Sequence, residues 1–219
     1  GGVSYSWTPS TGLSDTSISN PMASPVITTT YTVLVTDTNG CENTEVVTVT
    51  VNPLPVLTTS PDTVICLNDS TQLTASGGVS YSWSPSTGLS ATSISDPMAS
   101  PGVTTTYTVS VTDGNGCENS ESVTITVNPL PVVEAGNDIT LCNQPIAETL
   151  TGYSPTTGAG GTGVWTGQDV SAAGLFTPSG VGSFTLTYTF TDLNTCENFD
   201  TLVVTVIDPT PADAGLDFD

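Results

Sequence analysis

The sequence predicts an all-β protein built from small β-sandwiches that follow one another in tandem. Residues 1–55 match residues 77–131 without a gap, and 45 of the 55 positions are identical. Segments 104–112 and 121–127 alternate apolar and polar residues at a period of two, which is typical of half-buried strands. Thr, Ser, Val, Gly and Pro dominate the composition, and this mixture favours strands and turns over helices.

Pro-rich joints divide the chain into units. Spaced prolines favour an extended, semi-rigid backbone, so we expect stiff spacers between domains arranged as beads on a string. The joints fall at residues 52–55, 128–131 and 208–211. We predict an incomplete domain lacking its first strands at 1–52 (unit 1), complete domains at 56–128 (unit 2) and 132–208 (unit 3), and the opening strand of a further domain at 212–219.

Two interpretations account for the incomplete units at the two ends. In the first, the chain is a window cut from a longer array of the same repeat. In the second, the C-terminal strand of one molecule fills the vacant first-strand position of the next, which would give a strand-exchanged polymer. Both interpretations make neighbouring copies the expected partners, through domain stacking or strand complementation.

Within unit 2, each expected strand has its own signal. Residues 72–75 and 80–83 supply early strands, and the two alternating segments supply late ones. The turn at 113–116 reads Asp-Gly-Asn-Gly and suits a hairpin, because Asn and Gly tolerate a positive φ. About seven short strands in ~76 residues match a small β-sandwich. One Trp and one Tyr recur in every unit and are expected in the cores: Trp7, Trp83, Trp165, Tyr31, Tyr107 and Tyr188.

The charge balance excludes several classes of function. The chain has no Lys, Arg or His and carries 21 Asp and Glu, for a net charge of −21. Without cations it cannot neutralise phosphates, so no nucleic acid is expected as a partner. No segment approaches the ~18 consecutive apolar residues of a membrane helix, so no direct membrane insertion is expected. A Ser-His-Asp triad or a Schiff base needs His or Lys, and we expect that the protein is not an enzyme.

The cysteines recur in register with the repeat. Cys66 and Cys142 lie near the start of their units, and Cys117 and Cys196 lie near the ends. We therefore predict the pairs Cys66–Cys117 and Cys142–Cys196, each closing a loop of about 50 residues and contributing about 3–4 kcal/mol in the chain-entropy model. The partner of Cys41 would lie outside the chain or in another subunit. Regular disulfides indicate an oxidising compartment, so the predicted location is extracellular or at the cell surface.

An acidic turn recurs in all three units and is a candidate calcium site. Calcium prefers several oxygen ligands, and no other metal or cofactor is expected. The alternative is structural, because Asn-Gly and Asn-Thr turns favour the same residue types. The candidate ligands are Asp37, Asn39 and Glu42 in unit 1, Asp113, Asn115 and Glu118 in unit 2, and Asp192, Asn194 and Glu197 in unit 3.

Two longer strings recur in units 1 and 2. Tyr-Thr-Val-x-Val-Thr-Asp-x-Asn-Gly-Cys stands at 31–41 and 107–117, and Trp-x-Pro-x-Thr-Gly-Leu stands at 7–13 and 83–89. Both resemble polycystic-kidney-disease-type (PKD-like) and related immunoglobulin-like repeats of very large bacterial surface proteins. The resemblance covers essentially the whole chain and implies secreted, immunoglobulin-like β-sandwiches. The chain lacks the Gly-Asp-Gly turn that many PKD units carry after the Trp strand, so a sister immunoglobulin-like family is the alternative.

The resemblance also implies glycosylation. Surface proteins of this kind carry O-glycans at Asp-Ser or Asp-Thr followed by an apolar residue or Thr, and Thr63, Ser70 and Thr201 match that pattern. Asn68 fits an N-glycan sequon, because Ser70 follows it two positions later. We therefore expect a glycoprotein modified at one or more of these four residues.

These observations favour a structural function over a binding function. We expect an extracellular repeat segment that forms a stalk or filament at a bacterial cell surface. Stiff joints and a disulfide in each domain suit that role. The alternative is an adhesin or binding module that recognises carbohydrate or a partner protein. Long regular filaments in micrographs would support the first function, and monomers that bind a glycan array would support the second.

Overall fold

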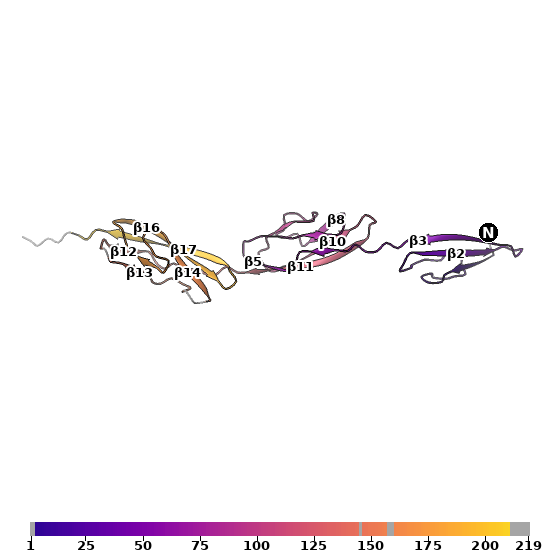
Figure 1. Cartoon of the computed structure of the whole chain (residues 1–219), viewed down its shortest axis with the longest axis horizontal. Coiled ribbons are helices and arrows are strands. Elements are labelled where there is room, and N and C mark those ends of the chain that lie inside the picture. The colour runs from indigo at the N-terminus through magenta and orange to yellow at the C-terminus, as the bar shows by residue number, and fades with distance from the viewer. Residues whose placement is uncertain (1–2, 145, 157–159, 211–219) are drawn as a thin grey trace, which may run out of the picture.

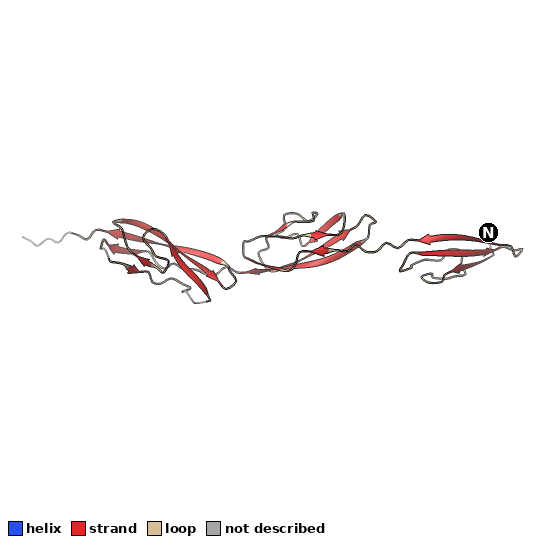
Figure 2. Cartoon of the chain, in the orientation of Figure 1, coloured by secondary structure: helices blue, strands red, loops and turns tan. Residues whose placement is uncertain are grey.

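The structure is a computed structural model and describes residues 3–144, 146–156 and 160–210. Every regular element in these ranges is a β-strand, and the ranges hold no helix long and apolar enough to span a membrane (Figure 2). The strands gather into three bodies in a row along the long axis of the molecule (Figure 1). They are β1 (Ser4–Thr8), β2 (Thr29–Thr36), β3 (Glu42–Val49), β4 (Thr58–Thr59), β5 (Thr63–Cys66), β6 (Thr71–Gln72), β7 (Ala75–Ser76), β8 (Ser80–Ser84), β9 (Met98–Ala99), β10 (Thr105–Thr112), β11 (Glu118–Asn128), β12 (Ile139–Cys142), β13 (Glu148–Thr149), β14 (Gly161–Thr166), β15 (Leu175–Phe176), β16 (Gly182–Asp192) and β17 (Glu197–Ile207).

Each larger sheet stays within one predicted unit. Unit 1 has the order β1-β2-β3, unit 2 has β5-β11-β10-β8, and unit 3 has β12-β17-β16-β14. Unit 2 adds the two-stranded pairs β4-β7 and β6-β9, and unit 3 adds β13-β15. Residues of the small pairs, such as Leu73, Ala75 and Ala99, pack in one cluster with Val109 and Ile125 of the large sheet. Two layers therefore enclose the core, which confirms the predicted all-β, immunoglobulin-like sandwich class.

Parallel pairing places a short early strand of units 2 and 3 beside the last strand of the same unit. In unit 2, β5 runs parallel to β11, and Cys66 at the end of β5 lies opposite Asn128. In unit 3, β12 runs parallel to β17, and Cys142 lies opposite Ile207. Because the chain leaves each unit after β11 or β17, both cysteines lie at the end of the sandwich that faces the following joint. We call this end the C-terminal pole. The opposite end, where the acidic turn precedes β3, β11 or β17, is the N-terminal pole.

Units 2 and 3 each bury a hydrophobic core of their own. Trp83 and Trp165 are only 3% exposed, which confirms their predicted role in packing. Tyr107 is fully buried, and its hydroxyl donates to the carbonyl of Thr87 at 2.7 Å. The core of unit 2 comprises Ile65, Leu73, Ala75, Trp83, Ala99, Tyr107, Val109, Val111, Val123 and Ile125. The core of unit 3 comprises Val133, Ala135, Leu150, Trp165, Phe176, Leu186, Tyr188, Phe190, Leu202, Val204 and Val206.

Unit 1 consists of a single three-stranded sheet in the described residues. Tyr31 is 1% exposed, and its hydroxyl donates to the carbonyl of Thr11 at 2.7 Å, as in unit 2. Val47 on β3 is 47% exposed, and among the described strands only β2 pairs with β3. Unit 1 therefore keeps the buried tyrosine and its hydrogen bond. One edge of its sheet and part of its apolar face are uncovered in the described residues.

Candidate functional site at the joint between units 2 and 3

A disulfide crosses the joint between units 2 and 3. It links Cys66 to Cys196, with a Cα–Cα distance of 5.5 Å and a sequence separation of 130 residues. Cys66 ends β5 at the C-terminal pole of unit 2, and Cys196 lies in the acidic turn at the N-terminal pole of unit 3. The bond therefore spans residues 128–131, the Pro-rich joint, and connects two domains rather than closing one.

The predicted pairs Cys66–Cys117 and Cys142–Cys196 are wrong. The structure leaves Cys117 and Cys142 as free thiols, together with Cys41. Cys117 precedes β11, whereas Cys66 lies opposite the last residue of β11. Eleven residues of extended strand separate the two ends by roughly 35 Å, and a disulfide needs Cα atoms within about 7 Å. The same geometry keeps Cys142 away from Cys196 at the two ends of β17.

The acidic turn holds Cys196 in position for this bond. Asp192 accepts backbone N–H groups from Asn194 at 2.8 Å and from Cys196 at 2.9 Å through its Oδ1 atom. Units 1 and 2 repeat the arrangement around Asp37 and Asp113. The backbone N–H of the turn cysteine is the largest cause that lowers the pKa of these two carboxyl groups. All three turns therefore present their cysteine in the same way.

One turn residue differs between the units. Gly40 and Gly116 occupy the position before the cysteine, with φ angles of 77° and 81°. In unit 3 the same position is Thr195, with a φ of 66°. A β-branched residue is strained in this left-handed region. The strained residue belongs to the turn that carries the bonded cysteine.

The calcium interpretation places its ligands in these turns, but the structure uses the same atoms for another purpose. The Oδ1 atom of each turn Asp accepts two backbone N–H groups, and its Oδ2 lies 3.4–3.5 Å from the side-chain amide of the turn Asn. In the part of the chain that the structure describes, no three His, Cys, Asp or Glu side chains converge as metal ligands. The geometry favours the structural alternative, and calcium binding stays a prediction.

Side-chain hydrogen bonds fasten each joint to the unit that follows it. Asn119 in β11 donates its Nδ2 to the carbonyl of Pro55 at 3.0 Å, and Asn198 in β17 donates to Pro131 at 2.9 Å. Behind the joint, the backbone N–H of Leu67 donates to the carbonyl of Asn128 at 2.8 Å. The joint between units 2 and 3 is thus held by hydrogen bonds on both sides, in addition to the disulfide.

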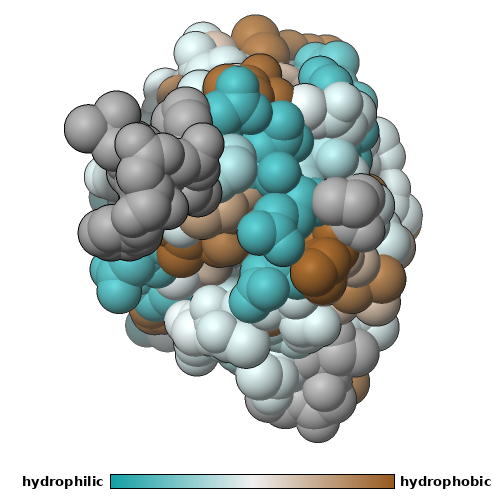
Figure 3. All heavy atoms as spheres, turned by 90° about the vertical axis from the view of Figure 1, so that its left-hand side faces the viewer, coloured by the Kyte–Doolittle hydropathy of each residue, from teal (hydrophilic) through white to brown (hydrophobic). Residues whose placement is uncertain are grey.

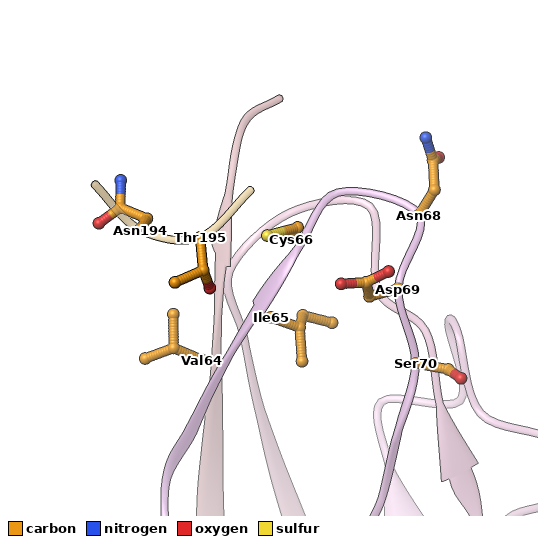
Figure 4. Close-up of a pocket in the computed structure, with 8 residues that line it drawn as sticks. All are labelled: Val64, Ile65, Cys66, Asn68, Asp69, Ser70, Asn194 and Thr195. Atoms are coloured by element: carbon orange, nitrogen blue, oxygen red, sulfur yellow. The ribbon is translucent and has the colours of Figure 1, made fainter. Parts of the chain in front are cut away.

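A polar hollow of about 560 Å³ lies where the two units meet (Figure 4). Unit 2 contributes the end of β5 and the turn after it, where Asn68 has a φ of 76°. Unit 3 contributes Asn194 and Thr195 from its acidic turn. The close-up shows the Cys66 sulfur directed toward this turn, with Asn68 and Asp69 on the other side of the hollow. The lining is Val64, Ile65, Cys66, Asn68, Asp69, Ser70, Asn194 and Thr195. Sequence reasoning missed this hollow, because its two walls belong to different units.

The glycosylation candidates lie in two regions. Asn68 and Ser70 are exposed in the turn that lines the hollow, and Thr63 is half-buried at the start of β5, the strand before this turn. Thr201 is exposed on β17 of unit 3. Glycosylation at these residues stays a prediction.

Three solved structures are distantly similar to this chain, each with a TM-score below 0.5. No family model and no curated protein matches the chain. The insect immune protein hemolin is 14% identical over 92% of this chain and 67% of that chain, with a TM-score of 0.38. A Ca²⁺-stabilised adhesin of an Antarctic bacterium is 13% identical over 82% of this chain and 57% of that chain, with a TM-score of 0.41. The extracellular cadherin domains 1 to 5 of protocadherin gamma B2 are 11% identical over 95% of this chain and 53% of that chain, with a TM-score of 0.29.

The chain spans between 53% and 67% of the length of these three structures. Their sequence identities to this chain are 11–14%. The strand order and the two enclosed cores carry the assignment. The chain has an all-β, immunoglobulin-like β-sandwich fold.

Proposed function

We propose that the chain is an extracellular structural repeat segment that forms a stalk or filament at a bacterial cell surface, like the PKD-like repeats that it resembles. The disulfide between Cys66 and Cys196 is the observation that carries the proposal. A domain gains stability from a bond within itself, but a bond between two domains fixes their relative orientation. Such a bond suits a protein whose successive domains must stay at a fixed angle and distance from one another.

The joint combines several restraints against bending. Pro129 and Pro131 restrict the backbone of the linker, and Asn198 anchors it to unit 3. The disulfide adds a second covalent connection beside the linker. Two parallel covalent connections between rigid bodies remove most hinge motions that a single linker would allow. Units 2 and 3 therefore act as one stiff element.

The chemistry of the surface suits an extracellular location. Disulfides persist in oxidising compartments. The absence of Lys and Arg removes the cleavage sites of trypsin-like proteases. The net charge of −21 keeps copies soluble and favours an extended shape through repulsion. The proposed partners are neighbouring copies, through domain stacking or strand complementation, with glycans on the surface and no catalytic role for the chain.

A spacer agrees better with the side chains than a carbohydrate-binding module does. Sugar sites commonly use exposed aromatic rings, yet Trp83 and Trp165 lie in the cores, and Trp7 is half-buried. Among the described residues, Phe199 is the large aromatic side chain with the greatest exposure, at 64%. The hollow at the joint is lined by amide, hydroxyl and carboxylate groups together with Val64, Ile65 and Cys66, and its lining contains no aromatic side chain.

Small-angle X-ray scattering tests the proposal. A compact protein of this length has a radius of gyration of about 17 Å, whereas a row of three sandwiches with strands of roughly 35 Å gives about 30 Å. We expect the larger value for the oxidised chain. The double variant C66S/C196S removes the bond without leaving a free thiol, and we expect a broader distribution of molecular lengths with the domains still folded. A compact oxidised chain, or an unchanged distribution in the variant, would contradict a stiffened spacer.

A further inference from the structure

The free thiol of Cys142 occupies the same place in unit 3 as bonded Cys66 does in unit 2. Each cysteine ends an edge strand that runs parallel to the last strand of its unit. In both units the next residue donates its backbone N–H to that last strand, from Leu67 to Asn128 at 2.8 Å and from Asn143 to Ile207 at 2.7 Å. Cys142 is exposed and unbonded. It therefore stands at the C-terminal pole of unit 3 in the geometry that forms a disulfide at the preceding joint.

The free thiol of Cys41 occupies the same place in unit 1 as bonded Cys196 does in unit 3. In both turns the Asp carboxylate four positions earlier accepts the backbone N–H of the cysteine, at 2.9 Å in each case. Cys41 is also exposed and unbonded. It stands at the N-terminal pole of unit 1. Cys142 and Cys41 are thus equivalent in position to Cys66 and Cys196, the two cysteines that form the disulfide at the internal joint.

Cys142 and Cys41 of the same molecule are too far apart to form a disulfide. Cys41 precedes β3 at the N-terminal pole of unit 1, and Cys142 ends β12 at the C-terminal pole of unit 3. Units 1 and 3 are the two outer bodies of the row of three (Figure 1), so these poles are on the order of 100 Å apart if each unit is one long strand in length. A bond between them must join two molecules head to tail. Such a contact is heterologous, so each added copy leaves a free Cys142 at one end and a free Cys41 at the other.

Two exposed surfaces are open to a second copy, one at the C-terminal pole of unit 3 and one along β3 of unit 1. The C-terminal pole of unit 3 faces the viewer in Figure 3 and mixes hydrophilic and hydrophobic residues. In unit 1, Val47 is 47% exposed on β3, whereas its counterpart Val123 in unit 2 is 1% exposed beneath the opening strands.

We propose that Cys142 of one copy forms a disulfide with Cys41 of a second copy, so that the chain polymerises head to tail through the same bond that crosses its internal joint. The proposal extends the structural function proposed above, on which it rests, by naming the partner and the linking atoms. Under this proposal Cys117 forms no disulfide between copies, because its half-buried thiol lies beside the joint between units 1 and 2.

The bond needs an oxidant, and a small disulfide such as oxidised glutathione supplies it. The Cys142 thiolate attacks one glutathione sulfur, which forms a mixed disulfide and releases one glutathione thiolate. The Cys41 thiolate of the second copy then attacks the Cys142 sulfur and releases the second glutathione. The two protein thiols lose two electrons to the glutathione disulfide, and their protons end on two glutathione thiols. Because each copy carries a charge of −21, salt should accelerate the step by screening repulsion.

The experiment exposes the purified chain, kept under non-reducing conditions, to oxidised glutathione at low and at physiological salt. Non-reducing electrophoresis should show a ladder of covalent oligomers that grows faster in salt. A protease that cuts after Glu suits the mapping, because the chain has no Lys or Arg. It leaves Cys41 in fragment 1–42, Cys142 in 135–148, Cys66 and Cys117 together in 46–118, and Cys196 in 149–197.

Mass spectrometry of these fragments separates the outcomes. A link between fragments 1–42 and 135–148 in the dimer band supports the proposal, and C41S and C142S should each abolish the ladder while C117S leaves it unchanged. A chain that stays monomeric with glutathione on Cys142 after the oxidation has run to completion, or dimers linked through two Cys142 or two Cys41 residues, would overturn it. The scattering of the monomer is measured independently, so an extended chain that fails to polymerise would reject this inference and retain the proposed spacer.

Discussion

Units 1 and 2 have nearly the same sequence over 55 positions but differ in how they bury it. Val123 is 1% exposed in unit 2, and the equivalent Val47 is 47% exposed in unit 1. Ala99 is fully buried, whereas Ala23 is exposed at the matching position. Tyr31 and Tyr107, by contrast, are buried alike and make the same hydrogen bond. Nearly identical local sequence gives equivalent long strands and the same buried tyrosine in both units, but a different core.

The difference lies in the residues before the shared segment. Unit 2 begins with residues 57–76, which supply Ile65, Leu73 and Ala75 to its core and β5 to the edge of its sheet. The described part of unit 1 has no such strands beside β3. The shared segment therefore does not form a closed core by itself. The strands that precede it in the sequence are needed to complete the core. An edge that lacks those strands exposes both apolar side chains and unpaired backbone groups.

The largest expected effect comes from truncating the same valine in both units. Val123→Ala should destabilise unit 2 by roughly 1–3 kcal/mol, because the side chain is fully buried. Val47→Ala, the matched control, should cost less than about 0.5 kcal/mol, because the side chain is half in water. Hydrogen exchange followed by mass spectrometry reports on β11 and β3 separately. Equal losses of protection in the two strands would mean that unit 1 encloses its valine as unit 2 does.

A smaller effect is expected from the turn that differs between units. Thr195→Gly should stabilise unit 3 by about 1 kcal/mol, because it removes left-handed strain from a β-branched residue. The reciprocal change Gly116→Thr should destabilise unit 2 by about 1–2 kcal/mol. A Cβ at Gly116 meets no atom within 4 Å, so the effect would be conformational and not a clash. Thermal unfolding at neutral pH measures both, and a destabilising Thr195→Gly would show that the threonine side chain holds the joint.

The smallest effect concerns pH. The backbone N–H of Cys117 lowers the pKa of Asp113 below 3.8, so the ionised carboxylate stabilises the folded turn. This contribution is fully present above the unfolded pKa and is lost as the pH falls through the lower folded pKa. Asp113→Asn should therefore reduce the Tm at pH 7, and the gap to the wild type should narrow below pH 3.8. A gap that widens toward acid would reverse the sign and reject the explanation.

Local patterns in the sequence were sufficient to predict the strands but not the pairing of the cysteines. The alternating segment at 104–112 corresponds to β10, and the turn at 113–116 separates it from β11 as expected. The recurring Trp and Tyr residues occupy the cores of the complete units because one side of each strand must be apolar. β5, in contrast, is a four-residue strand, and its parallel alignment with β11 depends on pairs of residues that lie 62 positions apart in the sequence.

That alignment decides which cysteines can meet. A spacing of 76 residues between Cys66 and Cys142 fits bonds within units and bonds between successive units equally well. Only the direction of β5 relative to β11 places Cys66 at the joint and Cys117 at the far end. Local sequence patterns could not predict the hollow beside the disulfide either. Its walls come from residues 64–70 and 194–195, which belong to different units.

The bond across the joint also decides which residues bear load when the two ends of the chain are pulled. Tension that enters at the N-terminal side reaches Cys66 and passes through sulfur to Cys196 without stretching the residues between them. The 130-residue loop that the bond closes contains most of both enclosed cores. Unfolded, that loop would add roughly 450 Å of length at about 3.5 Å per residue. An intact disulfide prevents this extension and so limits how far units 2 and 3 can lengthen under tension.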